Sequence, residues 1–167
     1  MTALVFVDTN VIVYARDAGE PQKQPRAAAW LEWLWRQQLG RTSMQVLSEY
    51  YVNVTRKLDP GLAPEVAWED VVALLTWRPQ PTDDTLLERG REIELRHRLS
   101  WWDCLVVGAA QLQGCAVLLT EDLQDGGVYG CVTVRNPFTH ALDEPIPAYA
   151  SAPPTVRGHP ARGRPRK

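Results

Sequence analysis

Short, uninterrupted apolar runs alternate along this chain with longer stretches in which apolar and polar residues recur at helical spacing. The runs 3–7 (ALVFV) and 116–119 (AVLL) are rich in strand-forming residues, and 132–134 is a third, shorter run. The first two contain no polar residue, which is typical of strands buried on both faces of a parallel sheet. We therefore expect central strands at these positions.

The segments between these strands carry the signals of helices. Apolar residues repeat every three or four positions in 25–39, and Gly40 ends that pattern. Ser43 and Ser100 stand where an N-cap is needed, and Pro64 suits the first turn of a helix. Strands separated by helices predict an α/β sandwich around a mostly parallel sheet. Helices are expected at 11–15, 25–39, 44–58, 64–75, 84–98 (capped by Thr82) and 101–113, with a brief strand at 76–78.

Charge divides the 167 residues into two parts. Residues 1–149 form one predicted domain, with 13 basic and 20 acidic side chains. The segment 150–167 is rich in proline, carries five basic side chains and no acid, and is expected to be a disordered basic tail. The acidic domain gives no sign of a polyanion partner by bulk charge. The tail is either a short arm for nucleic acid or a partner, or a solvated end without a role.

Cysteine usage and hydropathy indicate where the protein works. The three cysteines cannot all pair within the chain, and none belongs to a CxxC motif, which favours a reducing cytoplasm. The longest apolar runs are far shorter than the roughly 18 residues of a membrane span. The N-terminus does not follow the basic-then-apolar order of a secretory signal. We expect a cytoplasmic protein without a membrane segment.

Four acidic side chains occupy positions at the ends of predicted elements. Asp8 directly follows the first strand, and Asp122 follows the second at almost the same place. Sites in open α/β sheets form beyond the carboxyl ends of the strands, so these acids meet if the strands are neighbours. Asp103 and Glu49 lie early in helices that can point their first turns at the same edge.

A divalent cation would explain four carboxylates in one cleft, because without it they repel one another. Oxygen ligands without nearby His or Cys select Mg²⁺ or Mn²⁺, and such an ion supports phosphodiester hydrolysis by activated water. Each acid also has a structural interpretation. Asp8 and Asp103 suit helix or turn capping, Glu49 suits a solvent-facing position, and Asp122 and Asp125 flank a turn.

Five segments follow one another in a characteristic order: 5–14 (VFVDTNVIVY), 47–57 (LSEYYVNVTRK), 99–109 (LSWWDCLVVGA), 118–126 (LLTEDLQDG) and 134–138 (VRNPF). Together they resemble the PIN-domain ribonucleases, and in particular the VapC-type toxins of bacterial toxin–antitoxin pairs. They cover about residues 3–138. The resemblance implies a PIN-like three-layer α/β/α sandwich and a Mg²⁺- or Mn²⁺-dependent endoribonuclease that a cognate antitoxin holds inactive. It also implies a homodimer.

The resemblance also implies roles for individual residues. Asp8, Glu49, Asp103 and Asp122 are the expected catalytic and metal-binding acids, with Asp8 and Asp103 as the main ligands. Asp125 is a substitute for Asp122, because the turn between them can swing either acid inward. Thr9 and Asn10 are expected to steady Asp8 or to contact phosphate, and no residue is expected to bind an organic cofactor. Weaker candidates for phosphate contact are Arg41, Arg56, Lys57 and Arg98.

Two other functions compete with this hypothesis. A non-catalytic scaffold of the same fold would use an aromatic face and the basic tail. Trp35 points largely away from the core if Trp30 packs in it, and is then available for an antitoxin or dimer contact, or is a partly covered surface ring. A phosphatase with an aspartyl intermediate needs a second acid two residues after its nucleophile, and position 10 is Asn. A dinucleotide-binding dehydrogenase is disfavoured because no GxGxxG follows the first strand.

Overall fold

The computed structural model describes residues 3–140. The predicted basic tail at 150–167 and the domain boundary at 149 lie outside these residues. No helix in the described part of the chain has both the length and the apolar character needed to cross a membrane.

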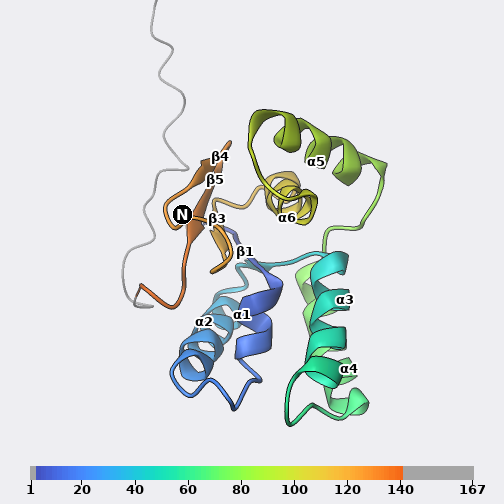
Figure 1. Ribbon diagram of the computed structural model, residues 1–167, viewed down its shortest axis with the longest axis vertical. Coiled ribbons are helices and arrows are strands. Elements are labelled where there is room, and N and C mark those ends of the chain that lie inside the picture. Colours follow the sequence, from blue (N-terminus) through green and yellow to red (C-terminus); the bar gives the residue numbers. More distant parts are fainter. Residues whose placement is uncertain (1–2, 141–167) are drawn as a thin grey trace, which may run out of the picture.

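A five-stranded sheet forms the centre of the structure (Figure 1), in the spatial order β2-β1-β3-β5-β4. The first four of these strands are parallel to their neighbours, and β4 is antiparallel to β5. β1 and β3 are direct neighbours, and Val7 pairs with Leu119. The last residues of these two strands therefore reach the same edge of the sheet. The strands are β1 (Val5–Val7), β2 (Gly40–Arg41), β3 (Val117–Leu119), β4 (Val128–Tyr129) and β5 (Val132–Arg135).

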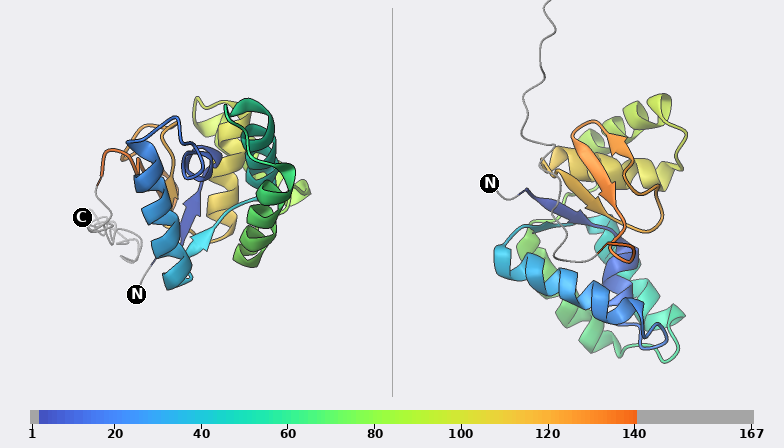
Figure 2. Two further views of the ribbon diagram at one scale, coloured as in Figure 1. Left: turned by 90° about the horizontal axis from the view of Figure 1, so that it is seen from below. Right: turned by 90° about the vertical axis from the view of Figure 1, so that its left-hand side faces the viewer.

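Helices cover both faces of this sheet. α5 and α6 pack on each other over one face, and α1 to α4 lie on the other, so that the sheet forms the middle layer (Figure 2). The predicted α/β/α sandwich with a mostly parallel sheet is confirmed. The helices are α1 (Thr9–Tyr14), α2 (Lys23–Gln37), α3 (Met44–Val52), α4 (Pro64–Leu74), α5 (Asp84–Arg96) and α6 (Trp101–Leu112).

The two central strands are buried because each has helices on both sides. All three residues of β1 and all three of β3 are buried, as the apolar runs predicted. α2 contributes large side chains from one stripe, such as Trp30 and Leu34, whereas α6 is buried all round from Cys104 to Ala110. Burial of this apolar surface is the main stabilising contribution, at about 25 cal/mol per Å².

Three expectations about local structure were wrong. The expected strand at 76–78 is instead a 3₁₀ turn (Leu75–Trp77) that ends at Arg78 in the left-handed conformation. The helix expected at 44–58 is α-helical only to Val52 and continues as a π-helical turn over Asn53–Lys57. Asp83, not Thr82, caps α5, because its carboxylate accepts the Leu86 amide. In each case packing or a neighbouring cap overrides the local propensity.

Gly40 provides a stability prediction. A Cβ built on Gly40 would lie 2.5 Å from the indole ring of Trp77, and that ring is buried. We expect Gly40→Ala to lower the free energy of unfolding by about 2 kcal/mol, measured by urea denaturation. In a Trp77→Leu background the same substitution should cost clearly less. Equal costs in the two backgrounds would show that the indole is not the cause.

Candidate active site

Asp8 stands at the junction of β1 and α1. Its amide donates to the Leu119 carbonyl at 3.0 Å, which continues the parallel ladder one residue past β1. Its carboxylate caps α1 by accepting the Thr9 amide at 2.7 Å. The second carboxylate oxygen accepts the Thr120 hydroxyl at 2.9 Å. The hydrogen bond to Thr9 confirms that Asp8 caps the helix. Only 5% of Asp8 is exposed, so a buried carboxylate also lies at the edge of the sheet.

Asp122 approaches Asp8 through a shared neighbour. The side-chain amide of Asn10 donates to Asp122 Oδ2 at 3.1 Å and to Thr120 Oγ1 at 3.0 Å, and lies 3.4 Å from Asp8 Oδ2. The Asp122 amide in turn donates to Thr120 Oγ1 at 3.1 Å. Asn10 and Thr120 therefore connect the ends of β1 and β3. Thr120 is fully buried, and nothing in the sequence singled it out.

Glu49 faces the same region from α3. The Thr9 hydroxyl donates to Glu49 Oε2 at 2.7 Å, and the Gln45 side-chain amide donates to Oε1 at 2.9 Å. Gln45 stands one turn before Glu49 on the same helix, so it orients the carboxylate from its own element. Ser43 caps this helix by accepting the Val46 amide at 3.2 Å, as expected.

These groups surround one cleft at the carboxyl edge of the sheet. Its volume is about 370 Å³, and the α1 and α3 side chains form most of its walls. Three acids line it, whereas no Lys or Arg does. The cleft is therefore an electronegative hollow open to solvent. Its lining residues are Thr9, Asn10, Val13, Tyr14, Asp17, Glu49, Asn53 and Asp122.

The electrostatics of Asp8 reflect this surrounding. The pKa of Asp8 is raised to about 7, mainly by burial and to a smaller extent by the nearby carboxylates of Asp122 and Glu49. The hydrogen bonds from Thr9 and Thr120 act in the opposite direction but do not cancel the effect. A pKa close to neutrality marks a group that would gain from a cation beside it.

Two further predicted acids, Asp103 and Asp125, do not line the acidic cleft. The Asp103 amide donates to Ser100 Oγ at 3.1 Å in the first turn of α6, as the capping motif predicted, and Asp103 does not line the acidic cleft. Asp125 accepts the Asn136 amide at 2.9 Å and pairs with His140 at 2.6 Å, beside a different hollow of about 200 Å³. Asp122 is therefore the acid of that turn that reaches the cleft.

The residues described do not form a ready-made metal cage. Within residues 3–140, no three His, Cys, Asp or Glu side chains converge closely enough to hold one ion. The hard oxygen donors of Asp8, Asp122 and Glu49 nevertheless suit Mg²⁺ or Mn²⁺. Mg²⁺ keeps several of its waters and commonly needs only one or two protein carboxylates.

A cluster that the sequence did not predict fixes the loop after β3. The Tyr14 hydroxyl donates to Glu121 Oε1 at 2.6 Å, and Lys23 Nζ pairs with Glu121 Oε2 at 2.7 Å. Lys23 also lies 4.5 Å from the centre of the Tyr14 ring. Because Asp122 directly follows Glu121, this cluster helps to determine where Asp122 can stand.

Comparison with known families matches residues 5–124 to the PIN domain. The chain belongs to the PIN domain family. The match contains Asp8, Glu49, Asp103 and Asp122, and it covers most of the chain. A comparison with curated proteins gave no match.

Two solved structures are similar in shape to this chain. One is a toxin–antitoxin complex from Klebsiella pneumoniae, with a TM-score of 0.54 and 17% identity, covering 80% of this chain and 97% of that one. Another is VapC20 of Mycobacterium tuberculosis, described as a Sarcin-Ricin loop cleaving toxin, with a TM-score of 0.48 and 21% identity. The aligned region covers 68% of this chain and 86% of the VapC20 chain. At 17% identity, the first similarity establishes the fold.

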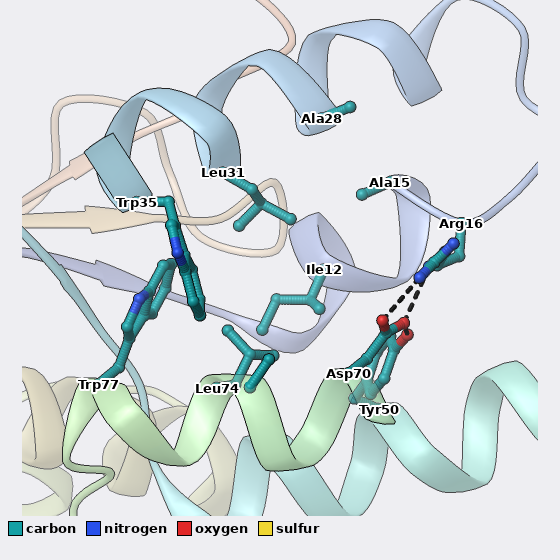
Figure 3. A pocket seen from close by; sticks show the side chains of 11 residues that line it. Ile12, Ala15, Arg16, Ala28, Leu31, Trp35, Tyr50, Asp70, Leu74 and Trp77 are labelled. Atoms are coloured by element: carbon teal, nitrogen blue, oxygen red, sulfur yellow. Dashed lines mark hydrogen bonds and ion pairs between the residues drawn. The ribbon is translucent and has the colours of Figure 1, made fainter. Parts of the chain in front are cut away.

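This PIN domain also has an apolar hollow of about 270 Å³ between α1, α2 and α4 (Figure 3). Arg16 and Asp70 close one end with two hydrogen bonds of 2.8 and 2.6 Å, and the Tyr50 hydroxyl donates to the same carboxylate. Trp35 and Trp77 stand at the other end. Trp35 is 44% exposed and Trp30 only 1%, so the two indoles diverge as helical geometry required.

Proposed function

We propose that this PIN domain protein is a Mg²⁺- or Mn²⁺-dependent endoribonuclease and the toxin of a toxin–antitoxin pair. The single observation that supports the nuclease activity is the cleft at the end of β1 and β3. Glu49 of α3 and Asp122 after β3 line it, Asp8 at the end of β1 is linked to both through Thr9 and Asn10, and no Lys or Arg among the described residues lines it. PIN nucleases generally use divalent metal ions, and this donor set is of the right chemistry.

Asp8, Asp122 and Glu49 are the residues we expect to hold the ion, with Asp103 as a further ligand. When bound, the ion would lower the pKa of a water molecule and offset the charge of the scissile phosphate. Thr9 and Gln45 would keep the Glu49 carboxylate facing the cleft. Asn10 would hold Asp122 beside Asp8, and it has an amide able to contact phosphate.

Asn10 supports a test of this arrangement. Asn10→Ala removes the amide that connects Asp122 and Thr120 and should lower RNA cleavage about 10- to 100-fold, as loss of a ligand-orienting group does. Asn53→Ala is the matched control. Asn53 lines the same cleft, but its amide donates to the Glu49 backbone carbonyl, so a change of no more than about twofold is expected. Similar losses in the two variants would argue against the role given to Asn10.

The proposed partners are an RNA substrate, a cognate antitoxin and a second copy of the chain. The Klebsiella structure of the same fold is a toxin–antitoxin complex, and PIN membership makes such a partner reasonable here. We place the protein in the cytoplasm, where RNA is available. Trp35 remains our candidate for the antitoxin or dimer contact, since it is the exposed indole of α2.

The deciding experiment is cleavage of a total RNA pool by the full chain, with Mn²⁺, with Mg²⁺ and with a chelator. Metal-dependent cuts at defined sites are expected. The alternative is a non-catalytic PIN scaffold, which the lack of a preformed three-ligand cage within residues 3–140 would favour. A scaffold would give neither cleavage nor a metal-dependent rise in melting temperature. That result would overturn the nuclease assignment.

A further inference from the structure

Besides the acidic cleft, the protein has another polar hollow. It shares Trp35 and Trp77 with the apolar hollow between α1, α2 and α4. Its volume is about 390 Å³, within the range of small-ligand sites, and it shares no residue with the acidic cleft. It is formed by the end of α2, the edge strand β2 and the turn after α4. Its lining residues are Trp35, Gln38, Arg41, Thr76, Trp77 and Arg78. We call it the Arg–Trp pocket.

The charge of this pocket is opposite to that of the rest of the protein. Two arginines and no acid line it, although acids exceed bases by seven in residues 1–149. Within residues 3–140, ion pairs engage basic residues such as Arg16, Lys23 and Arg36, whereas none engages Arg41 or Arg78. Arg41 is half-buried and gives one N–H to the Gly40 carbonyl at 2.7 Å, which leaves further donors for an anion.

The walls of the Arg–Trp pocket are held in place. Trp77 is buried against Gly40, and the Trp35 ring lies 5.4 Å from it at an angle of 38° (Figure 3). Arg78 has a left-handed backbone, and its carbonyl accepts the Gln113 side-chain amide at 2.8 Å. A ligand would therefore meet a fixed Trp77 ring and a fixed backbone at Arg78, which reduces part of the entropy cost of binding.

Two of the last four carbonyls of α2 already accept hydrogen bonds. The last carbonyls of a helix carry partial negative charge and would repel phosphate if they were free. The Gln38 amide donates to the Trp35 carbonyl at 3.2 Å, and the Leu39 amide donates to the Leu34 carbonyl at 3.1 Å. The two guanidinium groups carry the only formal charges among the described residues that line the pocket.

We propose that the Arg–Trp pocket binds one nucleotide, with the base on the exposed indole of Trp35 and the phosphate between Arg41 and Arg78. Half-exposed aromatic rings stack on unpaired bases, and guanidinium groups bind phosphate through paired N–H donors. That the nucleotide belongs to a single-stranded RNA substrate rests on the proposed function. The pocket would then hold the RNA at a place separate from the acidic cleft.

Mononucleotides test this proposal without any cleavage, because they contain no phosphodiester bond between nucleosides. Calorimetry with the full wild-type chain should show AMP binding at least about tenfold tighter than adenosine or inorganic phosphate, since both contacts contribute. Arg41→Gln and Arg78→Gln should each weaken AMP binding about tenfold or more, and Trp35→Leu should reduce AMP to the affinity of phosphate. Arg78→Lys, which keeps the charge but loses the paired donors, should give an intermediate affinity.

Arg36→Gln is the matched control, because Arg36 lies on α2 next to Trp35, pairs with Glu32 and is outside the pocket. Its AMP affinity should stay within about twofold of wild type. Equal AMP affinity in wild type and both Arg→Gln variants, with melting curves showing that all are folded, would overturn the proposal. A seven-residue polyglutamate peptide that binds more tightly than AMP would also overturn it and indicate a protein partner.

A six-nucleotide single-stranded RNA on the Asp8→Asn chain extends the test to the proposed substrate. Its affinity should fall with Arg41→Gln and Arg78→Gln as that of AMP does, and an unchanged affinity would contradict the RNA assignment. AMP binding with no nuclease activity under any condition would overturn the proposed function alone. Nuclease activity without AMP binding would overturn this inference alone.

Discussion

Asp8→Asn should reduce RNA cleavage on the order of a thousandfold while leaving the fold intact. Asn keeps an oxygen that can accept the Thr9 amide, so the cap of α1 survives. What disappears is the buried negative charge at the end of β1, and preorganised charges of this kind contribute factors of about 10² to 10³. Cleavage of a labelled RNA with Mn²⁺, together with circular dichroism, measures both quantities.

The turn after β3 supplies a matched pair of controls for that result. Asp122 lines the cleft, whereas Asp125 is bonded to Asn136 and His140 next to a separate hollow. Asp122→Asn should lose most of the cleavage activity, and Asp125→Asn should keep it. If Asp125→Asn is the inactive variant, the turn rearranges in solution and Asp125 replaces Asp122 as the fourth metal-binding acid. Full activity of Asp8→Asn would remove Asp8 from the mechanism.

The metal-free protein should become less stable as the pH rises, and Asp8→Asn should abolish most of this effect. The pKa of Asp8 is about 7 in the folded chain, well above the usual value near 4 of an unfolded one. Between these values the folded state holds a proton that the unfolded state has lost. The contribution of Asp8 to stability is thus fully present below about pH 4 and is lost as the pH approaches 7.

Urea denaturation in the presence of a chelator, at pH 5 and at pH 8, gives the size of this effect. The free energy of unfolding of the wild type, relative to Asp8→Asn, should fall by on the order of 2–3 kcal/mol over that interval. Mn²⁺ at pH 8 should restore stability to the wild type and have much less effect on the variant. A difference that does not change with pH would show that Asp8 is ionised in the metal-free protein.

Much of this arrangement could be predicted from local sequence. A buried parallel strand requires a continuous apolar run, so residues 3–7 and 116–119 predicted the positions of β1 and β3. Asp8 and Asp122 could then be placed just beyond the ends of these strands. The caps at Ser43 and Ser100 were also readable, because few residues can accept a backbone amide at a helix start. That β1 and β3 are neighbours was a condition of the argument, and the register of Val7 with Leu119 confirms it.

The remaining features depend on contacts between distant segments. β2 has only two residues, and its Gly40 matters because Trp77, far along the chain, packs on it. The position of Thr120 is decided by three partners on two strand ends, which no local pattern reveals. The Arg–Trp pocket is equally non-local, since Arg41 and Arg78 meet only after α3 and α4 have folded back. The roles of the four acids remain predictions until the variants are measured.

The junction between β1 and α1 contains no spare residue. Asp8 extends the strand ladder with its amide and caps the helix with its carboxylate, and Thr9 already belongs to α1. One inserted residue would turn the helix by about 100° and carry Thr9 and Asn10 off their partners. Natural or engineered changes in chain length should therefore be excluded from positions 7–10 and tolerated in the solvent-facing connection at 18–22. An insertion scan of the gene, selected for retained folding, would map that boundary.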